Sequence, residues 1–226
     1  MQRRKASNVM TNLRRLGALV FTACFALALA ACGSKEEDNA APKGEAIAKI
    51  APPAGQQWSE IAADTPEGGV VLGNPNAPIK LMEYASHTCP HCAEFSEHAS
   101  SALREKYVDS GVVSYELRNQ IHDSIDLTAS MLMRCSGPAA FHTLAEQFWG
   151  NLGPMVEQIQ KNNAGMAKAS TAPEAQRYQA IAEAAGLYDF FAARGISRDQ
   201  AMKCLADPAK ARAILDRSSK QSDELN

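Results

Sequence analysis

The chain has 226 residues, with 46% hydrophobic and 21% charged residues and a formal net charge of −2. The first 31 residues hold five positive charges and no negative one, so removing them from −2 leaves −7 for the remainder. Phosphate binding requires a basic surface, so this acidic remainder argues against nucleic acid as a partner. Residues 58–226 are long enough for one domain with a sizeable core.

The N-terminus has the pattern of an export signal. Basic residues come first, and an apolar run follows from Leu16 to Cys32. This run is too short for a comfortable membrane span and ends in small residues, as cleaved signals do. A plain secretory signal cut after Ala28-Leu29-Ala30 is one interpretation. Leu29-Ala30-Ala31-Cys32 also resembles the lipobox of bacterial lipoproteins, and we favour this interpretation, with residues 1–31 as the signal peptide and Cys32 as the lipidated residue.

Residues 32–57 follow as a polar segment rich in Ala, Pro and Gly, without an apolar period. Such a segment buries too little surface to offset the entropy lost on ordering. We therefore expect a lipid anchor followed by a flexible linker, which tethers the domain to a membrane.

An alternation of strands and helices follows the linker. Two short β-rich runs, Val70–Leu72 and Ile79–Tyr84, precede a helix that is expected from Pro90 to about Tyr107. The stretch VVSYELRN, residues 112–119, predicts the next strand. This order indicates a parallel β–α–β crossover unit. We expect a small sheet of about three strands.

A long helical region comes next, from residue 123 to residue 205, rich in Ala, Leu, Met and Gln. The expected fold class is therefore α/β, with a helical subdomain at 123–205 inserted into a sheet-containing domain formed by 58–122 and 206–226. A last helix is expected from about Pro208 to Lys220. Helix breaks are expected at Gly137-Pro138, Gly153-Pro154, Ala172-Pro173 and Gly195.

Cys89 and Cys92 lie in the stretch HTCPHC, at the expected junction of a strand and a helix. Residues three apart share a helix face, which brings the two sulfur atoms within bridging distance. A helix N-terminus presents unpaired N–H groups and a partial positive charge, and both stabilise a thiolate at Cys89. Pro90 suits the first helical position, and a protonated His91 would stabilise the thiolate further. The pattern predicts a reactive, reversible dithiol that needs neither cofactor nor metal.

Three other interpretations of the cysteine pair are open. A zinc site normally needs a second ligand pair at similar spacing, although the nearby His87, His91 and His98 could supply nitrogen ligands. Haem attachment requires His directly after the second cysteine, where Ala93 stands. An inert structural disulfide is disfavoured, because a bridge across two residues closes too small a loop to add much stability.

With CPHC after the strand IKLMEY, the chain resembles the DsbA family of bacterial periplasmic thiol–disulfide oxidoreductases, which have the thioredoxin fold. The stretch VVSYELRN resembles that family's next strand, and LTASMLMRCSGPAAFHTLAEQFW resembles the first helices of its inserted helical domain. The resemblance runs from about Trp58 to the C-terminus. It implies a thioredoxin-like fold with a helical insertion.

The resemblance also implies residue roles. Cys89 would be the exposed nucleophile, and Cys92 the resolving thiol that closes the bridge and releases the partner. Pro90 and His91 would tune the redox potential. Glu83 stands where the family carries a buried acid that shuttles a proton for the buried thiol, and a surface charge on an edge strand is the alternative for this residue.

The implied substrates are cysteines of exported proteins, and the implied electron partner is a quinone-linked membrane oxidase. The protein would be a membrane-anchored lipoprotein on the periplasmic side of the cell envelope. The Pro-His dipeptide resembles that of oxidants, which favours a disulfide donor. Two hypotheses compete with this one: a membrane-tethered metal-binding protein or metallochaperone that uses the same Cys/His cluster, and a structural lipoprotein with a fixed bridge.

The C-terminal part departs from the family pattern. The family places a cis-proline strand after the helical insertion, facing the active-site disulfide, and then a closing hairpin and helix. This sequence stops at DRSSKQSDELN, where that strand would begin. We expect a chain truncated before the strand, and the alternative is a shorter variant whose open sheet edge would favour aggregation.

Cys135 and Cys204 lie in the expected helical insertion of an exported protein, a setting in which disulfides persist. A bridge between them would close a loop of about 70 residues and add roughly 4 kcal/mol by the chain-entropy argument. Two separate buried thiols are the alternative. We favour the bridge.

Overall fold

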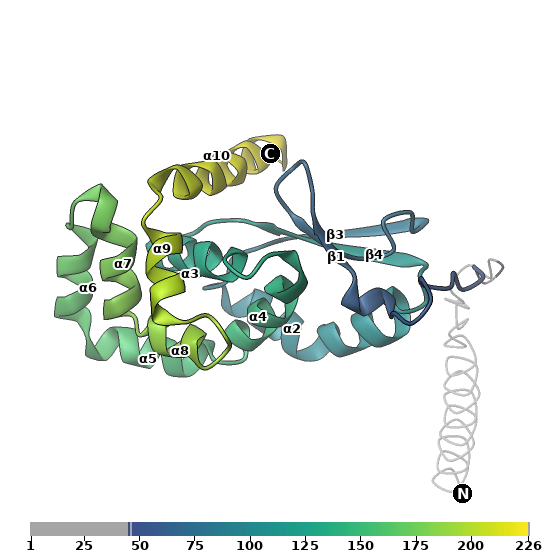
Figure 1. Ribbon diagram of the computed structural model, residues 1–226, viewed down its shortest axis with the longest axis horizontal. Helices are drawn as coiled ribbons and strands as arrows, with labels where there is room; N and C mark the ends of the chain where they lie inside the picture. Colours follow the sequence, from purple (N-terminus) through teal and green to yellow (C-terminus); the bar gives the residue numbers. More distant parts are fainter. Residues whose placement is uncertain (1–44, 46, 226) are drawn as a thin grey trace, which may run out of the picture. The chain divides into compact units, whose positions relative to one another are not determined.

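A computed structural model describes residue 45 and residues 47–225 (Figure 1). The predicted signal peptide, the predicted lipidated residue Cys32 and most of the predicted linker lie outside the described residues, and they stay predictions. Within residues 47–225, no helix combines the length and the apolar character that a membrane crossing requires.

The sheet has four strands in the order β1-β2-β4-β3. The first three strands in this order pair antiparallel, whereas β3 and β4 pair in parallel. The two predicted β-rich runs and the parallel crossover are therefore confirmed. The strands are β1 (Ala62–Asp64), β2 (Val70–Gly73), β3 (Ile79–Ala85) and β4 (Val113–Asn119).

The expectation of three strands was wrong by one, because β1 was not predicted. Its three residues, Ala-Ala-Asp, contain no β-branched or aromatic side chain and carry no strand signal of their own. The strand exists because the turn at Gly68, with φ of 84°, folds it back onto β2 as a hairpin.

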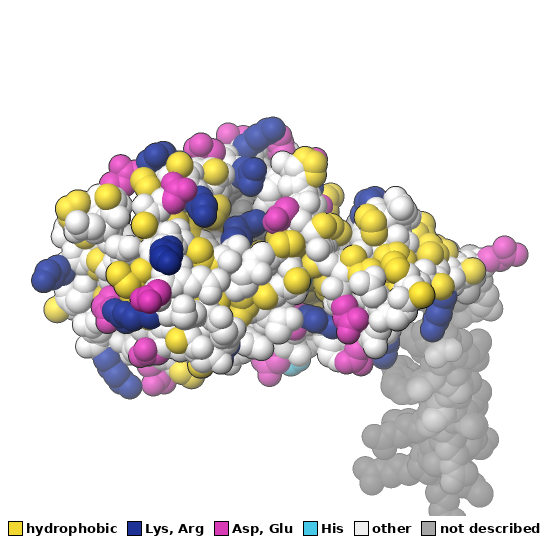
Figure 2. Space-filling model, viewed as in Figure 1, with side chains coloured by type: hydrophobic (Ala, Val, Ile, Leu, Met, Phe, Trp, Pro, Cys, Tyr) yellow, Lys and Arg dark blue, Asp and Glu magenta, His cyan; other side chains and the backbone are white. Residues whose placement is uncertain are grey.

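β3 forms one edge of the sheet in the described part of the chain. Ile79, Leu81 and Met82 are 46%, 38% and 49% exposed, so this edge strand presents large apolar side chains to solvent. Figure 2 shows hydrophobic side chains gathered over this end of the sheet. Within residues 47–225 no further strand pairs with β3 on its open side.

The crossover between β3 and β4 contains α2 (Pro90–Ala102) and a π-helical turn, η2 (Leu103–Val108). Together they form the helix that was predicted from Pro90 to about Tyr107. α2 and α4 (Pro138–Trp149) lie on one side of the sheet, and α10 (Pro208–Leu225) lies on the other (Figure 1). The last helix thus continues beyond its predicted end at Lys220.

The predicted helical insertion is present and packs around a continuous aromatic and aliphatic core. Asp123 begins it by capping α3, because its carboxylate accepts hydrogen bonds from the backbone N–H groups of Ile125 (2.7 Å) and Asp126 (2.8 Å). The helices are α3 (Ser124–Arg134), α4 (Pro138–Trp149), α5 (Leu152–Lys161), α6 (Asn163–Ser170), α7 (Glu174–Ala184), α8 (Leu187–Ala192) and α9 (Arg198–Leu205).

One predicted helix break, at Gly153-Pro154, was wrong. Both residues lie inside the first turn of α5, and the chain turns earlier, at Gly150 and Asn151. The first backbone N–H groups of a helix have no partner within the helix, so a proline at its third position loses no hydrogen bond. The breaks at Gly137, Pro173 and Gly195 are confirmed.

A disulfide joins Cys135, which ends α3, to Cys204 in α9. The structure thus contains the bridge favoured from the sequence rather than two separate thiols. The two Cα atoms are 6.1 Å apart, and 69 positions separate the residues along the chain. The bridge therefore holds the two ends of the helical insertion against each other.

The end of the predicted linker makes contacts with the domain. The backbone N–H of Ile50 donates to the carbonyl of Ser110 over 2.8 Å, and the indole of the buried Trp58 donates to the carbonyl of Ile50 over 2.8 Å. Trp58 itself lies in the short helix η1 (Trp58–Glu60). Ordered contacts therefore begin several residues before the predicted domain boundary at residue 58.

His142 connects the helical insertion to the sheet. Its ring is buried, and its Nε2 lies 2.9 Å from the carbonyl oxygen of Val70 in β2. Burial, aided by the charge of Arg104, lowers the pKa of His142 to about 4, against the opposing effect of the Val70 hydrogen bond. The imidazole is therefore neutral in the folded protein at pH values where it is partly charged in the unfolded chain.

We predict that the free energy of unfolding falls as the pH is lowered from about 6.5, the ordinary pKa of His142, to about 4. Over this window the unfolded chain binds a proton that the folded chain does not, which costs on the order of 3 kcal/mol. Urea denaturation of the full chain at graded pH measures this slope. His142→Asn should flatten the slope, whereas replacement of the exposed His98 by Gln should leave it unchanged, and an equal slope in all three chains would contradict the assignment.

Candidate active site

Cys89 occupies the N-cap position of α2, with extended backbone angles of φ −82° and ψ 122°. Its carbonyl accepts the first hydrogen bond of the helix, from Ala93 N–H over 3.1 Å. Pro90 stands at the first helical position, where its missing N–H costs no hydrogen bond. The sulfur of Cys89 thus belongs to the residue that meets the positive end of the helix dipole.

Cys92 lies one turn into α2 and is packed against the hydrophobic core. Both cysteines are free thiols, and a hydrogen bond joins their side chains. Burial raises the pKa of Cys92 to about 12, with smaller increases from Cys89 and from the charge of Glu83, against the opposing effect of a hydrogen bond to the backbone of Ser86. Cys92 is therefore a protonated thiol at neutral pH.

Glu83 lies on β3 and is half-buried rather than a free surface charge. Glu83 pairs with Leu117 in the parallel register, which places Tyr115, two residues earlier on β4, on the same face of the sheet. The hydroxyl of Tyr115 donates a hydrogen bond to the Glu83 carboxylate. Burial raises the pKa of Glu83, while this hydrogen bond and the nearby His87 oppose the rise.

Pro90 and His91, the two residues between the cysteines, are both exposed at the surface. The side chain of His91 is 91% exposed, and its Nδ1 lies 3.7 Å from a carboxylate oxygen of Glu94. The ring of His91 thus lies beside a surface carboxylate one turn along the helix. The tuning role of Pro90 and His91 stays a prediction.

The structure places a second histidine, His87, directly beneath the active-site turn. Its ring is fully buried and stacks on Trp149 with centroids 5.4 Å apart. Its backbone N–H donates to Asp126 over 2.9 Å, and its Nδ1 lies 3.0 Å from the hydroxyl oxygen of Ser130 and 3.3 Å from the Asp126 carboxylate. These contacts fix the turn that carries Cys89.

Asp126 holds this turn from α3. Burial alone would raise the pKa of the Asp126 carboxyl, but hydrogen bonds and charge from His87, with further hydrogen bonds from Ser86 and the backbone of His122, hold that pKa below its ordinary value. The interaction between Asp126 and His87 was not predicted. Because 39 positions separate the two residues, no local pattern in the sequence could have indicated it.

The metal-site interpretation is not supported. His87 is buried and contacts Asp126 and Ser130. His98 lies on an exposed face of α2. Across residues 47–225, no group of three or more His, Cys, Asp or Glu side chains is arranged to hold a metal ion.

A cleft of about 970 Å³ begins beside Pro90 and runs between α2 and the helices α4 and α5. Arg104 and Glu146 form an ion pair within its wall. Its other lining residues are Thr88, Ala93, Glu94, Ser96, Glu97, Ser100, Ser101, Glu105, Trp149, Gly150, Leu152, Gly153 and Val156.

A cysteine pair at the N-terminus of a crossover helix, in an α/β domain with a helical insertion, defines a thioredoxin-fold protein of the inserted type. The family model described as "Thioredoxin" matches residues 65–226. The chain therefore belongs to the thioredoxin family, and the predicted fold class is confirmed.

The chain is also similar to individual proteins. Over 71 residues, 31% of the chain, it is 42% identical to a protein of Rickettsia bellii (strain RML369-C) that is provisionally named a protein-disulfide oxidoreductase. This segment spans 27% of that relative's length. The crystal structure of a protein-disulfide isomerase from Novosphingobium aromaticivorans is 31% identical, with a TM-score of 0.62, over 66% of this chain and 77% of that one.

A third similarity concerns the fold alone. The crystal structure of Wolbachia pipientis alpha-DsbA1 is 23% identical, with a TM-score of 0.55, and the aligned part covers 74% of each chain. The arrangement of sheet and helical insertion is thus shared at low sequence identity.

We predict strongly unequal alkylation of the two active-site thiols in the reduced full chain. At pH 8.5, iodoacetamide should modify Cys89 at least about tenfold faster than Cys92, because only a thiolate reacts and the pKa of Cys92 is about 12. Peptide mass spectrometry measures both rates, and the urea-unfolded chain serves as the control in which they should converge. Glu83→Gln removes a charge that raises the pKa of Cys92, so it should speed the modification of Cys92. Equal rates in the folded chain would contradict this description of the site.

Proposed function

We propose that the protein is a thiol–disulfide oxidoreductase of the bacterial cell envelope, which exchanges a Cys89–Cys92 disulfide with cysteines of exported proteins and acts as the disulfide donor. The observation that carries the proposal is the chemical asymmetry of the pair. Cys89 lies at the N-terminus of α2, whereas Cys92 is a half-buried thiol packed against the core, whose pKa is raised to about 12. A structural disulfide stays closed, so a difference in pKa between its two thiols would play no part in its role.

The difference between the two thiols determines the order in which disulfide bonds form and break. A substrate thiolate attacks Sγ of Cys89 in the oxidised pair, forms a mixed disulfide and expels Cys92, which takes up a proton because of its high pKa. A second substrate thiolate then attacks the substrate sulfur and releases Cys89 as a thiolate at the helix N-terminus. The substrate loses two electrons to form its disulfide, and the Cys89–Cys92 pair gains them.

Glu83 is suited to handle the proton of Cys92. The charge of Glu83 raises the pKa of this thiol, and burial raises the pKa of Glu83 itself, so Glu83 accepts a proton more readily than a surface carboxylate does. The hydrogen bond from Tyr115 keeps the carboxylate in place beneath α2.

The direction of electron flow is inferred from the position of Cys89 at the N-terminus of α2. The positive end of a helix dipole favours negative charge, and a dithiol pair whose reduced form is stabilised is a stronger oxidant in its disulfide form. The resemblance of CPHC to oxidants supports the same direction. Re-oxidation then requires an acceptor, and a quinone-linked membrane oxidase is the partner that the resemblance implies.

The location rests on the N-terminal sequence pattern. A signal peptide over residues 1–31, a lipid on Cys32 and a polar segment that follows would hold the domain at a membrane surface of the envelope. In this compartment disulfides persist, as the Cys135–Cys204 bridge requires.

We predict that Cys92→Ser traps a mixed disulfide with a reduced substrate peptide that contains a single cysteine, because such a peptide has no second thiol to release itself from Cys89. The serine hydroxyl introduced by this change cannot displace the substrate from Cys89, so the adduct should persist for at least about tenfold longer than with the unchanged chain. Non-reducing electrophoresis detects the adduct, starting from Cys89 activated with an aromatic disulfide. Cys89→Ser should give no adduct, and an adduct that forms through Cys135 or Cys204 instead would contradict the proposal.

We further predict a reduction potential above that of the glutathione couple, because Cys89 lies at the positive end of α2 and CPHC resembles the motif of oxidants. The full chain with Cys135 and Cys204 both replaced by Ser isolates the active-site pair, and equilibration in graded glutathione buffers followed by thiol trapping gives its potential. A potential below that of the glutathione couple would contradict the donor role and indicate a reductase. A Cys89–Cys92 disulfide that glutathione never reduces would indicate a structural bridge.

A further inference from the structure

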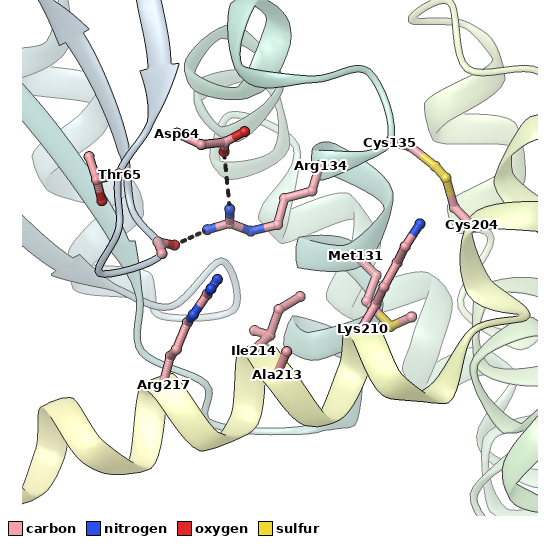
Figure 3. Close-up of a pocket in the computed structure, with 11 residues that line it drawn as sticks. Asp64, Thr65, Met131, Arg134, Cys135, Cys204, Lys210, Ala213, Ile214 and Arg217 are labelled. Atoms are coloured by element: carbon pink, nitrogen blue, oxygen red, sulfur yellow. Dashed lines mark hydrogen bonds and ion pairs between the residues drawn. A yellow bond between two sulfur atoms is a disulfide. The ribbon is translucent and has the colours of Figure 1, made fainter.

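A separate cavity of about 390 Å³ lies between α10, the C-terminal end of α3 and the turn that follows β1 (Figure 3). Its walls combine cationic side chains, a carboxylate, apolar side chains and the Cys135–Cys204 disulfide. The lining residues are Asp64, Thr65, Gly68, Met131, Arg134, Cys135, Cys204, Lys210, Ala213, Ile214 and Arg217. None of them belongs to the Cys89–Cys92 site.

The cavity carries an excess of positive charge. Arg134, Lys210 and Arg217 face a single carboxylate, Asp64, which leaves a formal charge of +2 on the lining. This contrasts with the net charge of −7 that the chain carries after residue 31. Figure 2 shows Lys and Arg side chains grouped below α10 on the same face.

Arg134 is held rigidly at the inner end of the cavity. Its Nη2 donates to the side-chain oxygen of Asn119 over 2.7 Å and to the carbonyl of Gly68 over 2.7 Å, and its Nε donates to Asn119 over 3.1 Å. Its guanidinium also lies 4.9 Å from the ring centroid of Phe141. Only a longer contact of 3.7 Å joins Nη1 to Asp64, whose side chain is 65% exposed.

The other two cations have no such partners. Within residues 47–225, neither Lys210 nor Arg217 forms an ion pair or a hydrogen bond through its side chain. Burial lowers the pKa of Arg134, Asp64 opposes this effect, and the charge of Arg217 lowers the pKa of Arg134 further. The two guanidinium groups therefore repel each other across the cavity, and an anion between them would relieve that repulsion.

The spacing along α10 suits an elongated molecule. Lys210, Ala213, Ile214 and Arg217 are at positions i, i+3, i+4 and i+7 and share one face of the helix. Seven residues rise by about 10 Å, so the two cations stand at opposite ends of an apolar strip. Figure 3 shows the Lys210 side chain directed toward the disulfide end of the cavity and the Arg217 side chain directed toward Arg134.

We propose that this cavity binds a small organic molecule with an acidic group at each end and an apolar middle, of the linear dicarboxylate class. One acidic group contacts Arg217 and Arg134, the other contacts Lys210, and the middle packs on Ala213, Ile214 and Met131. A cavity of this volume is at the lower end of the range for small-molecule sites and exceeds the needs of an inorganic anion. The disulfide preorganises the site by fixing the end of α3 against α9.

The test is isothermal titration calorimetry on the full chain with azelate, a linear nine-carbon dicarboxylate, as the probe. Nonanoate has the same number of carbons and one acidic group, and inorganic phosphate tests a simple anion. We expect azelate to bind with a dissociation constant below about 1 mM, at least about tenfold tighter than nonanoate or phosphate. Binding should weaken as the salt concentration rises, because two of the cations are exposed to solvent.

Two variants and a matched control test the location. Arg217→Gln and Lys210→Gln should each weaken azelate binding by about fivefold or more, since each removes one contact to an acidic group. Arg212→Gln removes the same charge from α10 at a position that pairs with Glu174 outside the cavity, and it should leave binding unchanged. All three side chains are exposed, so folding should be preserved, which circular dichroism verifies.

The proposal is overturned if azelate does not bind, or if nonanoate or phosphate binds as tightly as azelate. It is also overturned if Arg217→Gln and Lys210→Gln leave binding as strong as Arg212→Gln does. These outcomes are independent of the reactivity of Cys89 and Cys92.

Discussion

The parallel pairing of β3 with β4 is the constraint on which the rest of the structure depends. A parallel pair requires a crossover, and α2 is that crossover, so its N-terminus must lie at the end of β3. Cys89 falls at this N-cap, at the positive end of the helix dipole. The same register places Glu83 on the face of Tyr115, beneath the helix. Reactive sulfur and buried acid thus follow from one strand pairing.

A buried polar layer connects the active-site turn to the far side of α3. His87 contacts Asp126 and Ser130, Ser130 accepts a hydrogen bond from Asn119 over 3.1 Å, and Asn119 accepts two from Arg134. Buried polar groups are costly unless they are paired, so these contacts stabilise the layer, while Nε2 of His87 has no hydrogen-bond partner among the described residues. The layer orients the turn before Cys89, and its last member forms the inner end of the cationic cavity.

The two cysteines of the pair have different environments although they are only three residues apart. Position explains this difference, because the first cysteine caps the N-terminus of α2 and the second lies one turn into the helix, packed against the core. Burial disfavours a charged sulfur, and the nearby carboxylate of Glu83 disfavours it further. A pair with one accessible and one protonated sulfur is what ordered thiol–disulfide exchange requires.

The sequence by itself determined the class of fold, the crossover unit, the helical insertion and the cysteine motif, because these depend on local periodicity, caps and turns. It did not reveal β1, which forms only by pairing with β2, or the position of Pro154 within a helix. Only the tertiary structure decided that His87 meets Asp126 and that Arg134 faces Arg217, since these contacts join segments far apart in the chain. Long-range contacts depend on which faces pack together, and no spacing within one segment encodes that choice.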